Sequence, residues 1–144
     1  MKISPWAVGV IGILIFSIGC KAPGIGLTPA GLPLCPDSPN CVSSQAGTGK
    51  QAVRPLTYST DRSTAFAKIK QIVSNQNNAT IMVETSDYLH AEFRSKFMGF
   101  VDDMEFWFPE DQPVIHLRSA SRLGYSDFGV NRKRVQHIRA LFTK

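Results

Sequence analysis

The chain has 144 residues, 43% hydrophobic and 19% charged, which predicts one ordinary folded domain. Its formal net charge of +5 is unevenly distributed. Residues 35–111 carry seven Lys and Arg against ten Asp and Glu, whereas residues 112–144 carry seven against one. Because the positive charge is regional, we expect an anionic partner or an internal counter-patch. A uniformly basic nucleic-acid binder is excluded, and nucleic acid is not an expected partner.

The first twenty residues predict an export signal. Lys2 precedes an almost wholly apolar run over residues 7–18, and small residues follow before Cys20. The Ile-Gly-Cys ending resembles the bacterial lipobox, in which the cysteine is lipid-modified, although Ser17 stands where that motif prefers a branched apolar residue. The alternative is an uncleaved anchor, because the 17 uncharged residues 3–19 approach the length that spans a bilayer. Both alternatives predict an exported, membrane-anchored domain that faces the periplasm or the cell exterior.

Residues 21–34 contain three Pro and three Gly without a periodic apolar pattern, which predicts a flexible tether. The folded domain is then expected over residues 35–144. Five residues, two of them Pro, separate Cys35 from Cys41, and such a tight loop favours a disulfide in an exported protein. The alternative is a metal or redox pair, but neither a nearby His nor a CxxC spacing supports it. We expect no metal and no cofactor.

The predicted elements begin with a short edge strand over residues 51–56. A helix follows, capped by Asp61 or Ser63 and ending at residues 75–78. Its buried stripe is expected to comprise Ala65, Phe66, Ile69, Ile72 and Val73.

From Thr80 onward the apolar period changes to two. This predicts four strands, over residues 80–84, 88–94, 101–108 and 114–120. The last helix is expected over residues 130–142, with one apolar stripe formed by Asn131, Val135, Ile138 and Phe142. The predicted fold class is α+β: a four- to five-stranded, mainly antiparallel sheet with two helices packed on one face.

The last two strands favour one register. Setting Phe106 opposite Leu117 places Glu105 opposite Arg118 on the other face of the sheet. A slip of one residue would set apolar side chains against polar ones on both faces. The register predicts a charged face that carries Asp103, Glu105 and Arg118 and leads into a basic turn.

That turn belongs to residues 118–134, which hold five cations and one carboxylate. Three of the cations, residues 132–134, fall in the first turn of the last helix, where the positive end of the helix dipole disfavours them. One explanation is an anionic ligand at the helix N-terminus. Its candidate binding residues are Arg118, Ser119, Ser121, Arg122, Tyr125, Asp127, Asn131, Arg132 and Arg134. The other explanation is internal ion pairs with Asp102, Asp103 and Glu105, with Asp127 as the helix cap.

A catalytic triad would combine Ser121 or Ser126 with His116 or His137 and Asp127. No GxSxG motif surrounds either serine, so we assign no catalytic residues. The strand-turn-helix layout also lacks the glycine motifs of nucleotide-phosphate sites. We therefore expect a binding or accessory domain rather than an enzyme.

Three segments resemble the DUF1499 family. They are Leu-Cys-Pro-Asp-Ser-Pro-Asn-Cys-Val-Ser-Ser at residues 34–44, Gly-Phe-Val-Asp-Asp-Met-Glu-Phe at residues 99–106, and the basic stretch at residues 118–134. The resemblance covers roughly residues 34–142. The family occurs in bacterial exported proteins and lipoproteins and in photosynthetic lineages, and it has no established activity. The resemblance therefore implies one exported domain and leaves its mechanism open.

The leading hypothesis is an exported, lipid-anchored domain that binds a small anionic ligand or an envelope component at the basic strand-turn-helix site. One alternative is a hydrolase-like enzyme acting on an anionic envelope substrate. Another is a structural envelope protein whose basic face contacts anionic lipids. The expected partners are the membrane, through the N-terminal lipid or anchor, and a small anionic ligand.

Overall fold

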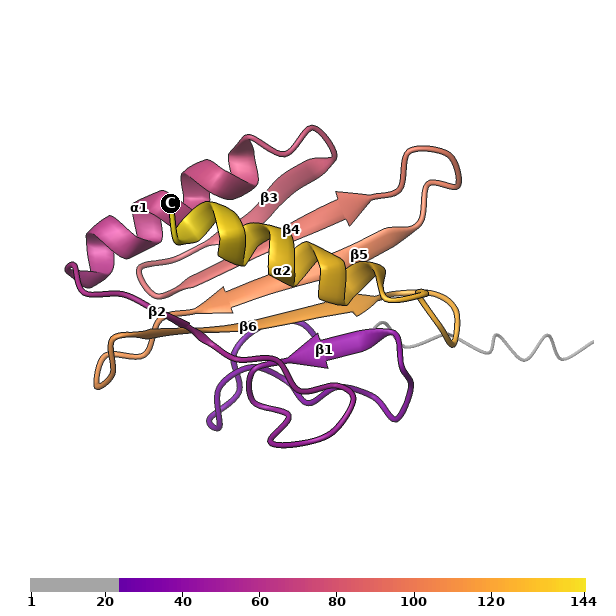
Figure 1. Cartoon of the computed structure of the whole chain (residues 1–144), viewed down its shortest axis with the longest axis horizontal. Coiled ribbons are helices and arrows are strands. Elements are labelled where there is room, and N and C mark those ends of the chain that lie inside the picture. The colour runs from indigo at the N-terminus through magenta and orange to yellow at the C-terminus, as the bar shows by residue number, and fades with distance from the viewer. Residues whose placement is uncertain (1–23) are drawn as a thin grey trace, which may run out of the picture.

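The computed structural model describes residues 24–144, so the predicted export signal and Cys20 lie outside the described residues. Two helices cover one face of an open, six-stranded antiparallel sheet (Figure 1), which confirms the predicted α+β class with one strand more than expected. The sheet order is β1-β6-β5-β4-β3, and β2 pairs with β6. The elements are β1 (Cys41–Ser43), β2 (Leu56–Thr57), α1 (Arg62–Ser74), β3 (Ala79–Glu84), β4 (Tyr88–Arg94), β5 (Val101–Trp107), β6 (Val114–Ser121) and α2 (Val130–Phe142).

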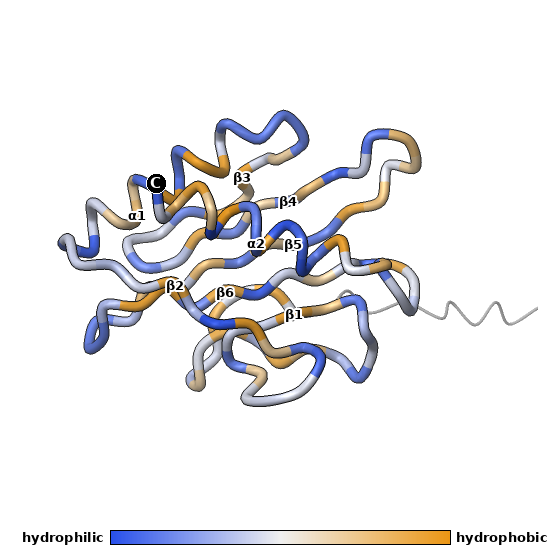
Figure 2. Tube along the Cα trace, viewed as in Figure 1, coloured by the Kyte–Doolittle hydropathy of each residue, from blue (hydrophilic) through white to orange (hydrophobic). Residues whose placement is uncertain are grey.

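The register expected for the last two strands is confirmed. In the β5–β6 pair, Phe106 lies opposite Leu117 and Glu105 lies opposite Arg118. Alternation along these strands sends the apolar side chains toward the helices, and Figure 2 shows hydrophobic residues recurring along strands and helices. Asp103, Glu105 and Arg118 occupy the other face, whereas Asp102 of β5 lies on the helix side, where it pairs with Arg134.

Both helices follow their predicted stripes. Asp61 caps α1, because its carboxylate accepts a hydrogen bond from the Thr64 backbone N–H at 2.9 Å.

No helix in the described part of the chain is long and apolar enough to cross a membrane. The described core cluster lies wholly between Val42 and Phe142, so a chain that begins at Lys21 retains all of it.

Strand β1, at one edge of the sheet, is absent from the elements predicted above, which begin at residue 51. Val42 is buried there and pairs with Ser119 of β6. A strand of three residues followed by Ser and Gly carries no periodic signal, so only its pairing partner reveals it. The predicted strand at residues 51–56 was too long, since β2 contains only Leu56–Thr57. A disulfide joins Cys35 to Cys41, the first residue of β1.

Residues 24–34, expected to belong to a flexible tether, make specific contacts with the sheet. The Gly26 backbone N–H donates to Glu105 Oε1 at 2.9 Å, on the face away from the helices. Gly31 has φ 103°, and a Cβ there would come within 2.6 Å of the Trp107 ring, so this close approach requires glycine. The Leu32 backbone N–H donates to Gln45 Oε1 at 2.8 Å. The residues before Gly24 lie outside the described part, and for them the tether stays a prediction.

Candidate functional site

The predicted binding residues begin on β6 with Arg118, which faces away from the helices. Its Nη1 lies 2.6 Å from Glu105 Oε2 on β5, and both side chains are fully buried. The other oxygen, Glu105 Oε1, accepts from the Tyr88 hydroxyl at 2.7 Å and from Gly26. Burial and the neighbouring Glu105 carboxylate raise the pKa of Tyr88 far above its usual range, so this hydroxyl remains a donor.

Arg122, the first residue after β6, binds the Asp103 carboxylate through two of its guanidinium nitrogens. Its Nε and Nη2 donate to the two carboxylate oxygens of Asp103 at 2.9 and 2.7 Å, and Nη2 also reaches Glu92 at 2.5 Å. His90 Nε2 lies 2.7 Å from Asp103 Oδ1. Burial alone would raise the pKa of Asp103, but the hydrogen bonds from Arg122 and His90 outweigh it and lower this pKa to about 2. We call the connected residues of this face the charged network: Tyr88, His90, Glu92, Asp103, Glu105, Arg118 and Arg122.

A second polar cluster lies on the helix side of the sheet. Arg134 of α2 donates to Asp102 at 2.6 Å and to the Asn131 side chain at 2.6 Å, and its guanidinium lies over the Phe93 ring. The Ser119 hydroxyl donates to Asn131 Oδ1 at 2.5 Å. Asn131 is fully buried, and its Nδ2 donates to the Asn40 carbonyl and to Ser121 Oγ. These contacts fasten α2 to β5 and β6.

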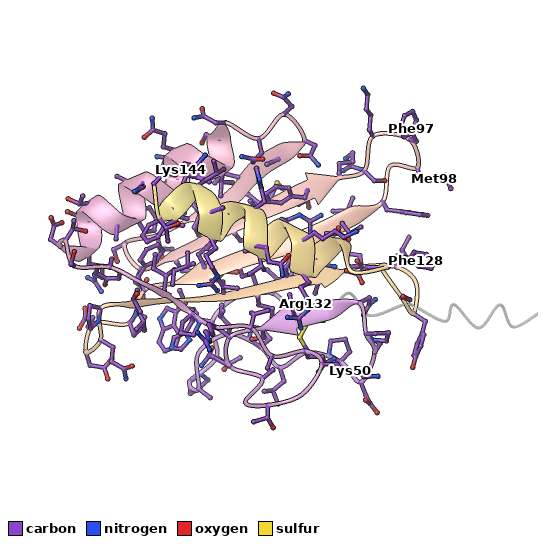
Figure 3. The ribbon with its side chains drawn as sticks, viewed as in Figure 1. Lys50, Phe97, Met98, Phe128, Arg132 and Lys144 are labelled. Atoms are coloured by element: carbon purple, nitrogen blue, oxygen red, sulfur yellow. A yellow bond between two sulfur atoms is a disulfide. The ribbon has the colours of Figure 1, made fainter. Side chains whose placement is uncertain are left out.

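Arg132 and Asp127 of the same stretch also bind groups within the protein. Arg132 donates to the backbone carbonyls of Lys50 and Ala52, which fixes the loop after β1 (Figure 3). The Asp127 carboxylate accepts from the Gly129 and Asn131 backbone N–H groups at 3.0 and 2.7 Å, which caps the start of α2. The four arginines of residues 118–134 therefore all bind acceptors within the protein.

Two donors of Arg118, Nε and Nη2, are buried and have no hydrogen-bond partner among the described residues. They do not by themselves make an anion site. The charged network contains three carboxylates, Glu92, Asp103 and Glu105, against the guanidinium groups of Arg118 and Arg122. A further anion beside Glu105 would be repelled, so these two donors suit a neutral acceptor better.

The residues considered for catalysis are not assembled into a triad. His116 Nδ1 lies 3.1 Å from Ser44 Oγ, and its ring stacks on Trp107. Burial lowers the pKa of His116. Asp127 is engaged by the α2 N-terminus, and Ser121 is engaged by Asn131. Within residues 24–144, no group of three or more His, Cys, Asp or Glu side chains is arranged to hold a metal ion.

The structure reveals a surface that the sequence reasoning missed. We call it the loop pair: residues 95–100, between β4 and β5, and residues 122–129, between β6 and α2. A cavity of ≈ 340 Å³ lies between the two loops, bounded also by Val130 at the start of α2. Exposed large hydrophobic side chains gather here: Phe97, Met98, Phe100, Leu123, Tyr125, Phe128 and Val130.

A sequence signal for this surface existed. Residues 97–100 read Phe-Met-Gly-Phe between two strands that already have their apolar faces, so these side chains had no place in the predicted core. Leu123, Tyr125 and Phe128 likewise fit neither the period of β6 nor that of α2. Apolar side chains that lie in a turn and fit no core position indicate an exposed interaction surface.

Comparison with models of protein families matches residues 31–142 to the family described as "Protein of unknown function (DUF1499)". The match covers more than half of the 144 residues and contains all three segments that carry the resemblance, which confirms it. No curated protein and no solved structure matches the chain.

The pairing of Glu105 with Arg118 predicts a strong coupling in stability. Arg118→Met should lower the free energy of unfolding by about 3–5 kcal/mol, because it leaves a buried carboxylate without its cation. The double variant Arg118→Met/Glu105→Leu should recover much of this loss, since no uncompensated charge remains. Urea denaturation measures both. The exposed control Lys133→Met should stay within about 0.5 kcal/mol, and a double variant no more stable than Arg118→Met would contradict the pairing.

The low pKa of Asp103 predicts a pH dependence of stability. A carboxyl whose pKa falls from 3.8 to about 2 on folding stabilises the protein above pH 3.8 and loses that contribution as the pH falls through about 2. The unfolding free energy of the wild type should therefore drop more steeply across this window than that of Asp103→Asn. Denaturant titrations at several pH values measure the difference, and parallel curves would refute the assignment.

Proposed function

Because the chain belongs to the DUF1499 family, whose description assigns no function, we propose a function from its own residues: an exported, membrane-anchored envelope domain that docks on an anionic bilayer through the loop pair. The observation that carries the proposal is the gathering of exposed apolar side chains on two adjacent loops. Phe97 is 92% exposed and Phe128 is 90% exposed. In Figure 3, Phe97, Met98 and Phe128 all project outward at one end of the molecule.

Phe128 adds a second argument, because its exposure brings no benefit to the fold. Its φ is 52°, the left-handed region, and it is the only such non-glycine residue among those that the structure describes. For an ordinary side chain this conformation costs about 1–2 kcal/mol. An aromatic ring held in a strained conformation and turned to solvent supports a role outside the folded core.

The charges around the loop pair favour an anionic surface. Lys96 on the first loop and Lys133 on the first turn of α2 are exposed, and neither makes an ion pair within the described residues. Each Lys or Arg near an anionic membrane surface contributes about 1 kcal/mol of attraction. Tyr suits the bilayer interface because its ring has an apolar body and a polar hydroxyl, and the Phe rings add apolar area.

The internal contacts of the basic stretch favour this function over the other two hypotheses. A small anionic ligand would compete with Asp102, Asp103 and Glu105 for Arg134, Arg122 and Arg118. The triad considered for a hydrolase would need Asp127, which caps α2 instead. Bilayer docking requires neither free arginines nor a free Asp127, because it uses side chains that the fold leaves exposed.

Docking should depend on the tips of the loop pair. For residues 21–144, Phe97→Ser/Met98→Ser should weaken binding to phosphatidylglycerol vesicles by about tenfold or more, because burying each side chain contributes about 1.5–3 kcal/mol. Vesicle co-sedimentation measures this. Added salt should also weaken the binding, since Lys96 and Lys133 act electrostatically.

A matched control is available on β3, where Met82 and Val83 are 50% and 44% exposed but lie outside the loop pair. Met82→Ser/Val83→Ser should leave vesicle binding unchanged. Melting followed by circular dichroism checks that each variant folds. Equal loss of binding in both double variants, or no binding by the wild type, would overturn the proposed docking surface.

Attachment through Cys20 is tested separately in the full chain. The lipobox prediction expects the mature N-terminal peptide to begin at Cys20 and to carry lipid, which mass spectrometry detects. Cys20→Ala should abolish this modification. A mature wild-type protein that retains residues 1–19, or that carries an unmodified Cys20, would rule out acylation and favour the uncleaved anchor or an ordinary signal.

A further inference from the structure

The cavity between the two loops has the size and walls of a site for an apolar group. Its volume of ≈ 340 Å³ falls in the range of about 300–1,000 Å³ that small-molecule sites occupy. Apolar side chains from both loops and from the start of α2 line it: Phe100, Leu123, Phe128 and Val130. Phe97 and Met98 stand outside its lining, at the tip of the first loop.

The polar groups in the wall already have partners. Asp102 pairs with Arg134, Asp127 caps α2, and Ser121 Oγ accepts from Asn131 Nδ2. A charged ligand group inside the cavity would therefore find no free counter-charge and would lose its hydration. An alkyl chain needs no polar partner, and it would cover apolar side chains that otherwise face water.

Other concavities in the described chain differ in character. One of ≈ 380 Å³ is lined mainly by hydroxyl-bearing residues 57–60 and Thr64, together with Lys68. Another of ≈ 430 Å³ has three charged side chains in its wall, Arg62, Glu110 and Asp111. Both lie around the start of α1, away from the loop pair.

We propose that the cavity of the loop pair binds one acyl chain of an anionic phospholipid taken from the bilayer. The chain lies among Phe100, Leu123 and Val130, and the anionic headgroup stays outside, where Lys96 and Lys133 are exposed. That the lipid comes from the bilayer depends on the proposed docking function. That an acyl chain binds depends on the cavity alone. Docking and acyl-chain binding are therefore tested by substitutions at different residues.

The experiment uses the full chain reconstituted in phosphatidylglycerol vesicles that contain a trace of the same lipid with a photoactivatable group at the end of one acyl chain. After irradiation, peptide mapping by mass spectrometry should find label on the cavity wall, at Phe100, Leu123 or Val130. Val130→Trp fills the cavity and should reduce this label about tenfold, because the chain loses its apolar enclosure. Label at Phe97 and Met98 should remain.

A control variant on the same helix is Gln136→Trp, which adds an equal volume at an exposed position outside the cavity. It should leave the wall label unchanged. Leu123→Asp offers a second test at a residue that is 60% exposed, where a change of fold is not expected. It should also reduce the wall label, because a carboxylate disfavours both the acyl chain and the anionic headgroup.

The outcomes separate the two proposals. Docking would stand, but acyl-chain binding would be overturned, if Phe97 and Met98 are labelled and the label on the cavity wall is the same in the wild type, Val130→Trp and Leu123→Asp. No label on either loop would overturn docking and, with it, the membrane source. A photoactivatable free fatty acid supplied to the same vesicles is the second arm. Preferential wall labelling by that fatty acid would overturn the assignment to a bilayer phospholipid.

Discussion

The buried pairing of Glu105 with Arg118 is the constraint on which much of this structure depends. Two opposite charges without solvent exposure require that β5 and β6 keep one register, because a slip would leave both groups unpaired. The same carboxylate binds Tyr88 on β4 and the backbone of Gly26. One side chain therefore connects three strands to the segment that precedes the domain.

This constraint also decides what the basic stretch is available to do. Arg118, Arg122 and Arg134 bind carboxylates on β4 and β5, while Arg132 binds backbone carbonyls. The positive charges near the C-terminus thus largely neutralise the negative charges of the preceding strands. The side chains that the loop pair exposes to solvent are mainly apolar, and exposed lysines lie beside them. Both membrane proposals are based on this combination.

The predictable parts of the fold are those in which apolar residues repeat at the period of a helix or a strand. Helix α2 and the β5–β6 register follow from repeated apolar positions, since burial of one face leaves only one consistent arrangement. Strand β1 and the contacts of residues 24–34 have no such repeat. Gly31 reveals its role only beside Trp107, because the reason for a glycine there is a neighbour 76 positions away in the chain.

The sequence by itself determined the α+β class, the family, the pairing of the last strands and the concentration of charge near the last helix. These are local or periodic properties, and local chemistry suffices to predict them. Only the tertiary structure decided which charges neutralise one another and which apolar side chains remain outside. Both depend on distances between segments far apart in the chain. Phe97 and Phe128 become one surface only because the sheet brings their loops to the same end.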